Sequence, residues 1–167
     1  MSGSDEHPSP TPDPERIATA YHEAGHAVAA LALDRPVTRV SILPRRDFLG
    51  ICAFGKAVFR PSEDWLEREV LISLAGMAAE ARLTGNYDQQ AAGRDLLYAR
   101  RLALQRAGNE RQAERLQKRM LSKVENLLGD EENWQAVQRI AAELLLRSEI
   151  SGRQARHLYE EIARARE

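Results

Sequence analysis

The sequence contains an H-E-x-x-H motif, formed by His22, Glu23 and His26. On an α-helix, residues four apart lie one turn apart and differ by about 40° around the axis, so both imidazoles can reach one cation. Imidazole is a common zinc ligand, and a glutamate beside two such ligands can remove a proton from water. The motif therefore predicts a Zn²⁺ site with His22 and His26 as ligands and Glu23 as the catalytic base.

The surroundings of this motif are apolar. Glu23 is the only formally charged side chain between Ile17 and Leu33, so the helix must be largely buried and Glu23 needs a cation, a donor or a polarised water. Gly25 is costly inside a helix, which indicates close approach of another element. The alternative is that the histidines are hydrogen-bonded core residues and Glu23 pairs with an arginine. That alternative explains each residue separately but not their spacing.

A catalytic zinc site usually has three protein ligands and an open position, so a third ligand must come from elsewhere. Cys52 is better explained as a small core residue, and His157 lies in the last helix. Glu80 is an isolated charge in an apolar run, and Asp95 shares a predicted helix face with apolar residues, among them Ala99. Each carboxylate could instead pair with an arginine. The residues alone leave Glu80 and Asp95 as equal candidates.

The elements that must position these side chains are mainly helical. Caps, breaks and apolar spacing predict six helices, near residues 13–33, 62–84, 89–107, 110–128, 130–146 and 151–166. Two β-branched and apolar stretches, residues 37–43 and 50–59, predict one small two-stranded β-ribbon. The expected fold is therefore mainly α, an array of about six helices with this ribbon.

The sequence predicts one domain that follows an N-terminal tail. Four of its seven prolines lie in the first fourteen residues, so we expect residues 1–12 to be disordered and residues 13–167 to form a single metallopeptidase domain. The net charge of −1 supplies no global attraction for nucleic acid. One cysteine, no signal pattern and no membrane-length apolar run favour a cytoplasmic protein without a membrane segment.

From Ile17 onward, the chain resembles the peptidase domain of the FtsH-type ATP-dependent zinc metalloproteases. The matching segments keep the order of that family. They are residues 20–27 around the motif, residues 40–45 and 49–50 in the ribbon, residues 74–76 and 78–80 in the second helix, and residues 95–96 with Ala99 in the third.

The resemblance implies a fold of helices with a small ribbon, a bound Zn²⁺ and a polypeptide substrate. It also implies that Asp95 is the third metal ligand, while Glu80 lies beside the site and orients a ligand histidine. The sequence departs from the family pattern at Arg46, Met77, Arg94 and Arg100, which bears on substrate binding and oligomer contacts rather than on the metal.

The family joins its peptidase to an ATPase module and membrane helices, which we do not find in this sequence. Residues 50–57 fit G-x-x-x-x-G-K, but Ala57 stands where a Ser or Thr must hold magnesium, and Arg60-Pro61 interrupts any following helix. The expected activity is therefore hydrolysis of peptide bonds in unfolded or flexible polypeptides. A homo-oligomer or a partner unfoldase would extend this activity to folded substrates.

Two further expectations concern the reaction. An edge of the ribbon could hold substrate as an added strand, with pockets near Ile42 and Leu49. The oxyanion could be stabilised by Tyr21, Tyr98 or His157, and nothing in the sequence singles out one of them.

The alternative function is a non-catalytic helical zinc-binding module that interacts with partner proteins or, less favourably, nucleic acid. Residues 101–123 carry seven basic side chains and two acidic ones. No aromatic residue is interleaved for base stacking, so a solvated helix face is the simpler explanation of this stretch.

Overall fold

Helix α1 (Pro14–Ala32) is the central element of the computed structural model, which describes residues 11–56 and 64–165. Its start follows from its sequence: the Asp13 side chain accepts a hydrogen bond from the backbone N–H of Glu15, and Pro14 occupies the first turn. Every residue from His22 to Leu31 is buried. The prediction of a buried motif helix is therefore confirmed.

The described residues form six helices and a three-stranded sheet, in agreement with the predicted fold class. The remaining elements are β1 (Val37–Ser41), β2 (Ile51–Phe54), α2 (Trp65–Thr84), α3 (Gly93–Arg106), α4 (Glu110–Gly129), α5 (Glu131–Arg147), β3 (Glu149–Ser151) and α6 (Gly152–Arg164). None of the described helices is long and apolar enough to cross a membrane. Residues 1–10 of the predicted tail lie outside the described part of the chain.

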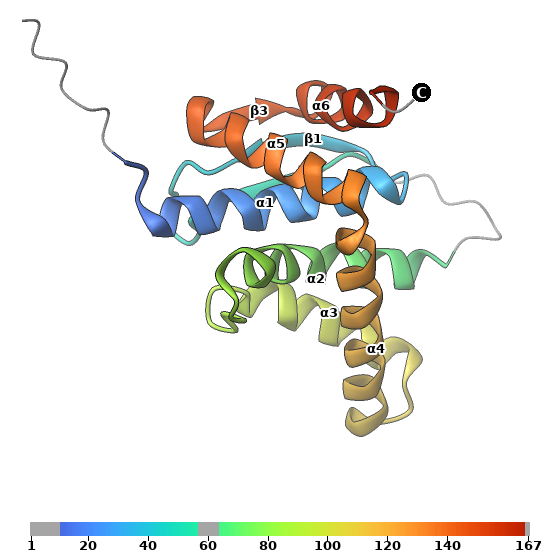
Figure 1. The fold of residues 1–167 in the computed structure, drawn as a ribbon. Coiled ribbons are helices and arrows are strands. Elements are labelled where there is room, and N and C mark those ends of the chain that lie inside the picture. The colour runs from blue at the N-terminus through green and yellow to red at the C-terminus, as the bar shows by residue number, and fades with distance from the viewer. Residues whose placement is uncertain (1–10, 57–63, 166–167) are drawn as a thin grey trace, which may run out of the picture.

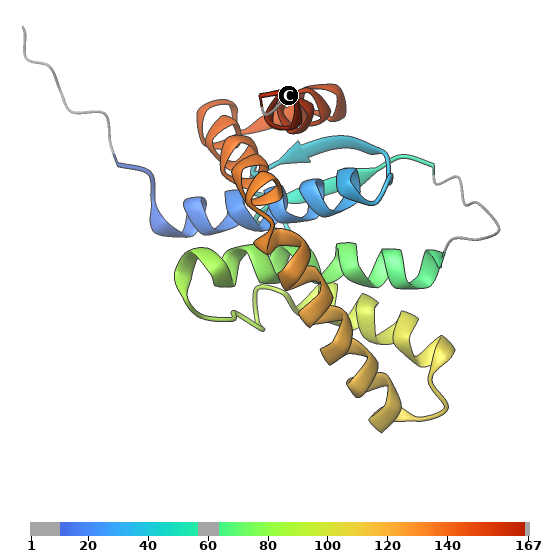
Figure 2. The ribbon, with the colours of Figure 1, turned by 45° about the vertical axis from the view of Figure 1, so that its right-hand side comes forward.

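The elements stack in layers (Figure 1). Helix α6 covers one side of the sheet, α1 lies on its other side, and α2 and α3 follow beyond α1. In the turned view of Figure 2, α1 and α2 still run side by side, while α4 projects away from the stack. The motif helix is therefore enclosed between the sheet and α2.

Close contact between α1 and α2 depends on small residues. A Cβ atom on Gly25 would lie 2.6 Å from both the Ala75 carbonyl oxygen and the Ala79 Cβ. Such contacts are impossible without a shift of one helix, so the prediction that Gly25 marks a close approach is confirmed. The approach brings the middle of α2 against both motif histidines.

The sheet has one strand more than the sequence indicated. Its order is β2-β1-β3 and all pairs are antiparallel, with Val40 opposite Cys52 on one side and Ile150 on the other. Strand β3 has only three residues, of which Ile150 alone is buried. A single inward residue cannot display the alternation that identifies a strand.

Two helices begin later than predicted. Asp64 caps α2, because its carboxylate accepts from the backbone N–H of Glu67, whereas the sequence predicted a start near residue 62, which lies outside the described residues. Helix α3 begins at Gly93, because the Asp88 carboxylate accepts from the backbone N–H groups of Gln90 and Ala91 and holds a turn before it. The end of α2 at left-handed Gly85 agrees with the prediction.

Candidate metal centre

Helix α1 presents the two motif histidines toward α2 and α3. Their side chains are almost completely buried, with His22 8% and His26 6% exposed. The two rings lie edge to face, 4.9 Å between centroids. The helical spacing thus brings both imidazoles to one place, as the motif predicted.

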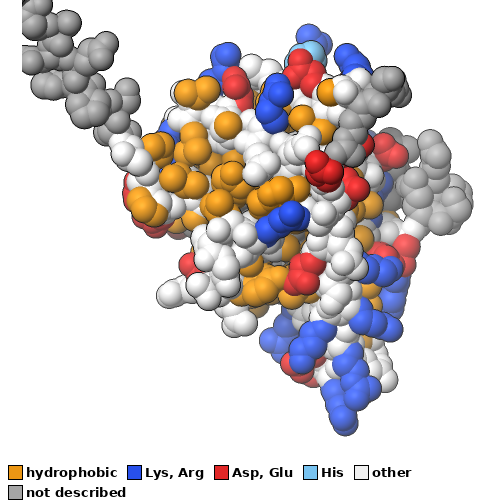
Figure 3. Space-filling view, in the orientation of Figure 1, with side chains coloured by type: hydrophobic (Ala, Val, Ile, Leu, Met, Phe, Trp, Pro, Cys, Tyr) orange, Lys and Arg blue, Asp and Glu red, His pale blue; other side chains and the backbone are white. Residues whose placement is uncertain are grey.

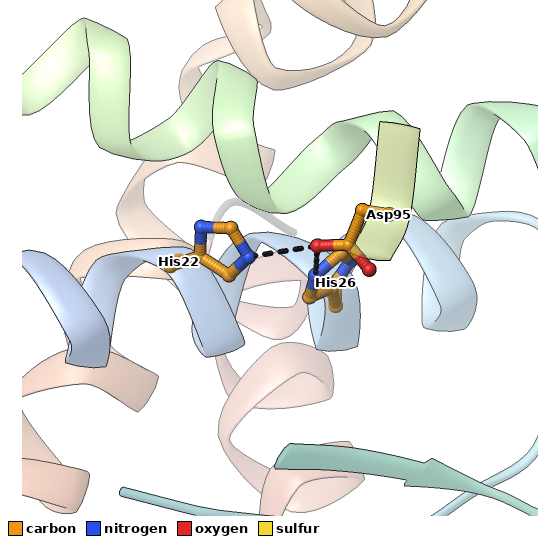
Figure 4. A group of neighbouring side chains, drawn as sticks. All are labelled: His22, His26 and Asp95. Atoms are coloured by element: carbon orange, nitrogen blue, oxygen red, sulfur yellow. Dashed lines mark hydrogen bonds and ion pairs between the residues drawn. The ribbon is translucent and has the colours of Figure 1, made fainter. Parts of the chain in front are cut away.

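Asp95, at the start of α3, completes a group of three ligand-type side chains (Figure 4). Its Oδ2 lies 3.0 Å from Nε2 of His22 and 3.1 Å from Nε2 of His26. One potential ligand atom from each residue lies within 4.8 Å of the other two. Of the two carboxylates that the sequence left open, the structure places Asp95 on the side where the Nε2 atoms converge.

The other nitrogen of each imidazole has its own partner. Nδ1 of His22 donates to Oε2 of Glu80 at 2.9 Å, and Nδ1 of His26 donates to the carbonyl oxygen of Ile72 at 2.7 Å. A carbonyl oxygen can only accept, so the neutral His26 ring carries its hydrogen on Nδ1. When both rings are neutral, their Nε2 atoms present lone pairs toward Asp95, which is the tautomer that binds a metal.

This arrangement requires a positive charge. The Asp95 oxygen lies about 3 Å from each Nε2 atom, and it would repel both nitrogen lone pairs unless a cation lies between them or a ring is protonated. Burial opposes protonation of His22, but hydrogen bonds to Asp95 and Glu80 and the charge of Glu23 outweigh it and raise its pKa to about 10. Burial likewise opposes the charged form of Asp95, yet the two histidines hold the pKa of its carboxyl below the usual range.

Zinc fits this donor set. Two nitrogens and one carboxylate oxygen are typical of a catalytic zinc site, and ligand atoms on a tetrahedral zinc ion are about 3.4 Å apart. The observed separations from Asp95 are 3.0 and 3.1 Å, so each needs to widen by only a few tenths of an ångström. The hydrogen bonds on both Nδ1 atoms would keep the rings in place during that adjustment.

Glu23 lies next to this group of three side chains. It is 6% exposed, and no described residue donates a hydrogen bond to its carboxylate. Burial raises its pKa, while the nearby His26 and His22 oppose that rise. The backbone of Gly50 passes so close that a Cβ there would lie 2.8 Å from Oε1 of Glu23. Glu23 is thus a mostly buried carboxylate beside the two histidines.

Several contributions to this site were missed in the sequence. A Cβ on Gly76 of α2 would lie 2.4 Å from Nε2 of His26 and 2.6 Å from Nε2 of His22, so only glycine leaves room for a ligand there. Ser73 donates from its hydroxyl to the backbone carbonyl of Asp95 at 2.8 Å and fixes the start of α3. Gly76 could have been identified from the sequence, because a glycine inside an apolar helix is unusual. The Ile72 carbonyl could not, because a backbone group has no residue type that marks it.

The other candidates lie elsewhere. His157 is exposed on α6 and faces Glu161 at 3.2 Å, and Tyr21 packs against Trp134. Tyr98 interacts electrostatically with Glu69 and Arg35. Cys52 packs against the core, and its pKa is raised by burial and by the charge of Glu23. Among the described residues, no hydrogen bond or ion pair joins these side chains to His22, His26 or Asp95, although the charge of Asp95 also raises the pKa of Cys52.

Comparison with known proteins gives a consistent result. Residues 11–126, more than half of the chain, match the sequence model of peptidase family M41. The "ATP-dependent zinc metalloprotease FtsH" of Magnetococcus marinus is 42% identical over 98 residues, covering 53% of this chain and 14% of that protein. The "ATP-dependent zinc metalloprotease FtsH 2" of Sorangium cellulosum is 39% identical over 98 residues, covering 53% and 15%. The chain thus spans about a seventh of the length of these relatives.

Proposed function

Because the chain belongs to peptidase family M41, we propose that it is a zinc-dependent endopeptidase that cleaves unfolded or flexible polypeptides. The observation that carries this proposal is the convergence of two Nε2 atoms and one carboxylate oxygen beside a buried glutamate. His22, His26 and Asp95 would hold the ion. Glu80 and the Ile72 carbonyl would orient the imidazoles.

When bound, zinc supplies positive charge that acidifies a water molecule and polarises the scissile carbonyl. Glu23 removes a proton from that water as its oxygen attacks the carbonyl carbon. The carbon–nitrogen bond then breaks, and Glu23 returns the proton to the leaving amine. Burial favours this role because it raises the pKa of Glu23 and strengthens its hold on the transferred proton.

Strand β2 is the proposed docking edge for substrate. It pairs with β1 on one side, and in the described chain no strand pairs with its other side. Leu49, just before β2, is 48% exposed and is available to contact a substrate side chain. Ile42 is only 2% exposed and belongs to the core, and the pocket expected near it stays a prediction.

The relatives are named as ATP-dependent, and energy-driven unfolding remains a proposal for this chain. In the near match to a phosphate loop, residues 51–54 are strand β2, so the described part of that stretch forms no such loop. We therefore propose flexible polypeptides as the direct substrates. Folded substrates would need a homo-oligomer or a partner unfoldase.

The test is cleavage of unfolded casein by the purified protein, with and without a chelator, beside Glu23→Gln. We expect about one zinc per chain, cleavage by the wild type that the chelator removes and added zinc restores, and a loss of at least about 1000-fold in Glu23→Gln with zinc retained. A stable wild-type protein that binds no zinc, or a Glu23→Gln variant that cleaves normally, would refute the proposal.

A further inference from the structure

A groove of about 510 Å³ lies between the end of α3 and the first half of α4, away from the metal centre. Four of its lining residues are basic: Arg106, Arg115, Lys118 and Arg119. The floor includes Ala107 and Leu116, the latter 8% exposed. The groove therefore combines an apolar floor with a cationic rim.

The rim charges are mostly available to a ligand. Arg106 is the exception, because its guanidinium already donates to both carboxylate oxygens of Asp64, at 2.5 and 2.7 Å. Lys118 has only an exposed 3.5 Å pair with Glu114, which water weakens. Arg115 and Arg119 are exposed and form no ion pair with any described residue.

The positive charge is local. Residues 101–123 hold seven basic and two acidic side chains, although the whole chain carries −1, so the rest of the molecule is acidic. Figure 3 shows Lys and Arg side chains gathered at the end where α4 projects. A negatively charged ligand is thus attracted to this end and repelled by the rest.

The groove favours a polypeptide over a nucleic acid. None of its lining residues is aromatic, so it offers no platform on which bases could stack. Its buried leucine instead suits an apolar side chain, and the arginines around it suit carboxylates on either side of that residue. The matching ligand is an acidic peptide segment with an apolar residue.

Helix α3 connects this groove to the metal centre. Asp95 lies in its first turn and Arg106 at its end, eleven residues or about 16 Å away. An extended segment of about five residues spans that distance. One substrate chain could therefore occupy the groove and the metal centre together.

We propose that this groove is an exosite that anchors substrates through an acidic segment about five residues or more from the cleaved bond. The inference rests on the proposed protease function. It goes beyond that function by naming a second contact surface and a substrate class.

Binding is tested without cleavage in the full-length Glu23→Gln protein loaded with zinc. The probe is a fluorescein-labelled Gly-Ser peptide with four glutamates around one leucine, followed by fluorescence anisotropy. We expect Arg115→Glu/Arg119→Glu to weaken its affinity at least about tenfold, with a loss that shrinks as salt rises. The control Arg153→Glu/Arg156→Glu makes the same charge change on exposed positions of α6 and should leave affinity within about twofold.

Peptide composition gives the second arm. Replacing the glutamates by glutamine should abolish binding, and replacing the leucine by serine should weaken it several-fold. Equal losses in the two double variants, or tighter binding of single-stranded DNA of equal charge, would overturn the proposal. Unchanged circular dichroism melting of each variant excludes unfolding as the cause.

Cleavage links the groove to substrate. With otherwise wild-type protein and a quenched peptide that carries the acidic segment, Arg115→Glu/Arg119→Glu should raise KM about tenfold and leave kcat unchanged. A peptide without the segment should be cleaved equally by both proteins. Equal KM values for the acidic peptide would overturn the exosite while proteolysis stands. If the wild type binds but cuts nothing, the protease proposal fails and the exosite fails with it.

Discussion

Helices α1 and α4 are nearly equal in length, 19 and 20 residues, but they are constrained in opposite ways. Around the motif, α1 is buried on every side, and the second nitrogen of each histidine has a partner. Helix α4 buries one stripe and exposes its charges to water. The comparison teaches that the metal centre should respond to single-atom changes, whereas the basic surface should respond only to summed charge.

The largest expected effect is on zinc binding in Asp95→Ala. This change removes the oxygen on which both Nε2 atoms converge, so we expect zinc affinity to fall by about 1000-fold or more. Competition with a chromophoric chelator measures it. Asp47→Ala, in the exposed turn between β1 and β2, is the control and should keep full affinity. Retained affinity in Asp95→Ala would remove Asp95 from the ligand set.

The metal-free protein should lose stability as the solution becomes alkaline. The pKa of His22 is raised to about 10, above its ordinary 6.5, so the stabilisation from its protonation is complete below pH 6.5 and disappears as pH rises through 10. Between pH 7 and 9 we expect a loss of about 2 kcal/mol in the free energy of unfolding. Urea titration measures it. Zinc-loaded protein should not lose stability over this pH range. If it lost as much stability with zinc bound, protonation of His22 would not be the cause of the loss.

Gly76→Ala should damage the centre sterically without removing any ligand. The added methyl would overlap Nε2 of both histidines, so we expect zinc affinity to fall about 100-fold. The matched control is Gly93→Ala on α3, where a Cβ meets nothing within 4 Å. Equal zinc affinities in these two variants, measured by the same chelator competition, would show that the α1–α2 contact is not as tight as described.

Glu80→Gln should have a smaller effect, because the amide oxygen can still accept from Nδ1 of His22 but carries no charge. We expect about a tenfold loss of zinc affinity and a lower pKa for His22 in the metal-free protein, which NMR titration can follow. An unaltered His22 titration would rule out Glu80 as its orienting partner.

The smallest effect is expected on α4. Arg111→Ala removes an exposed charge that forms no ion pair with a described residue, so the free energy of unfolding should change by less than about 0.5 kcal/mol. Thermal unfolding measures the change. A loss above 1 kcal/mol would mean that this surface is as constrained as the metal centre.

Most element boundaries were predictable because they depend on local chemistry. Asp13-Pro14 begins α1 and Gly85 ends α2, since a capping carboxylate and a left-handed glycine act within one turn of chain. Strand β3 was not predictable. Its pairing with β1 joins residues more than a hundred positions apart, and its own three residues carry no period.

The site divides in the same way. His22, Glu23 and His26 were identified from the sequence because a helix converts their spacing directly into geometry. Asp95 and Glu80 were equivalent by composition and were separated by the family resemblance. The structure distinguishes them by position: Asp95 meets the Nε2 atoms, and Glu80 meets Nδ1 of His22.

The sequence by itself thus determined the buried motif helix, the mainly helical class and the kind of chemistry available. Only the tertiary structure decided which distant atoms surround the imidazoles, among them the Ile72 carbonyl and the space left by Gly76. The physical reason is the distance along the chain over which each feature is set. Helical spacing is set within one turn of chain, whereas these contacts depend on how closely α1, α2 and α3 pack.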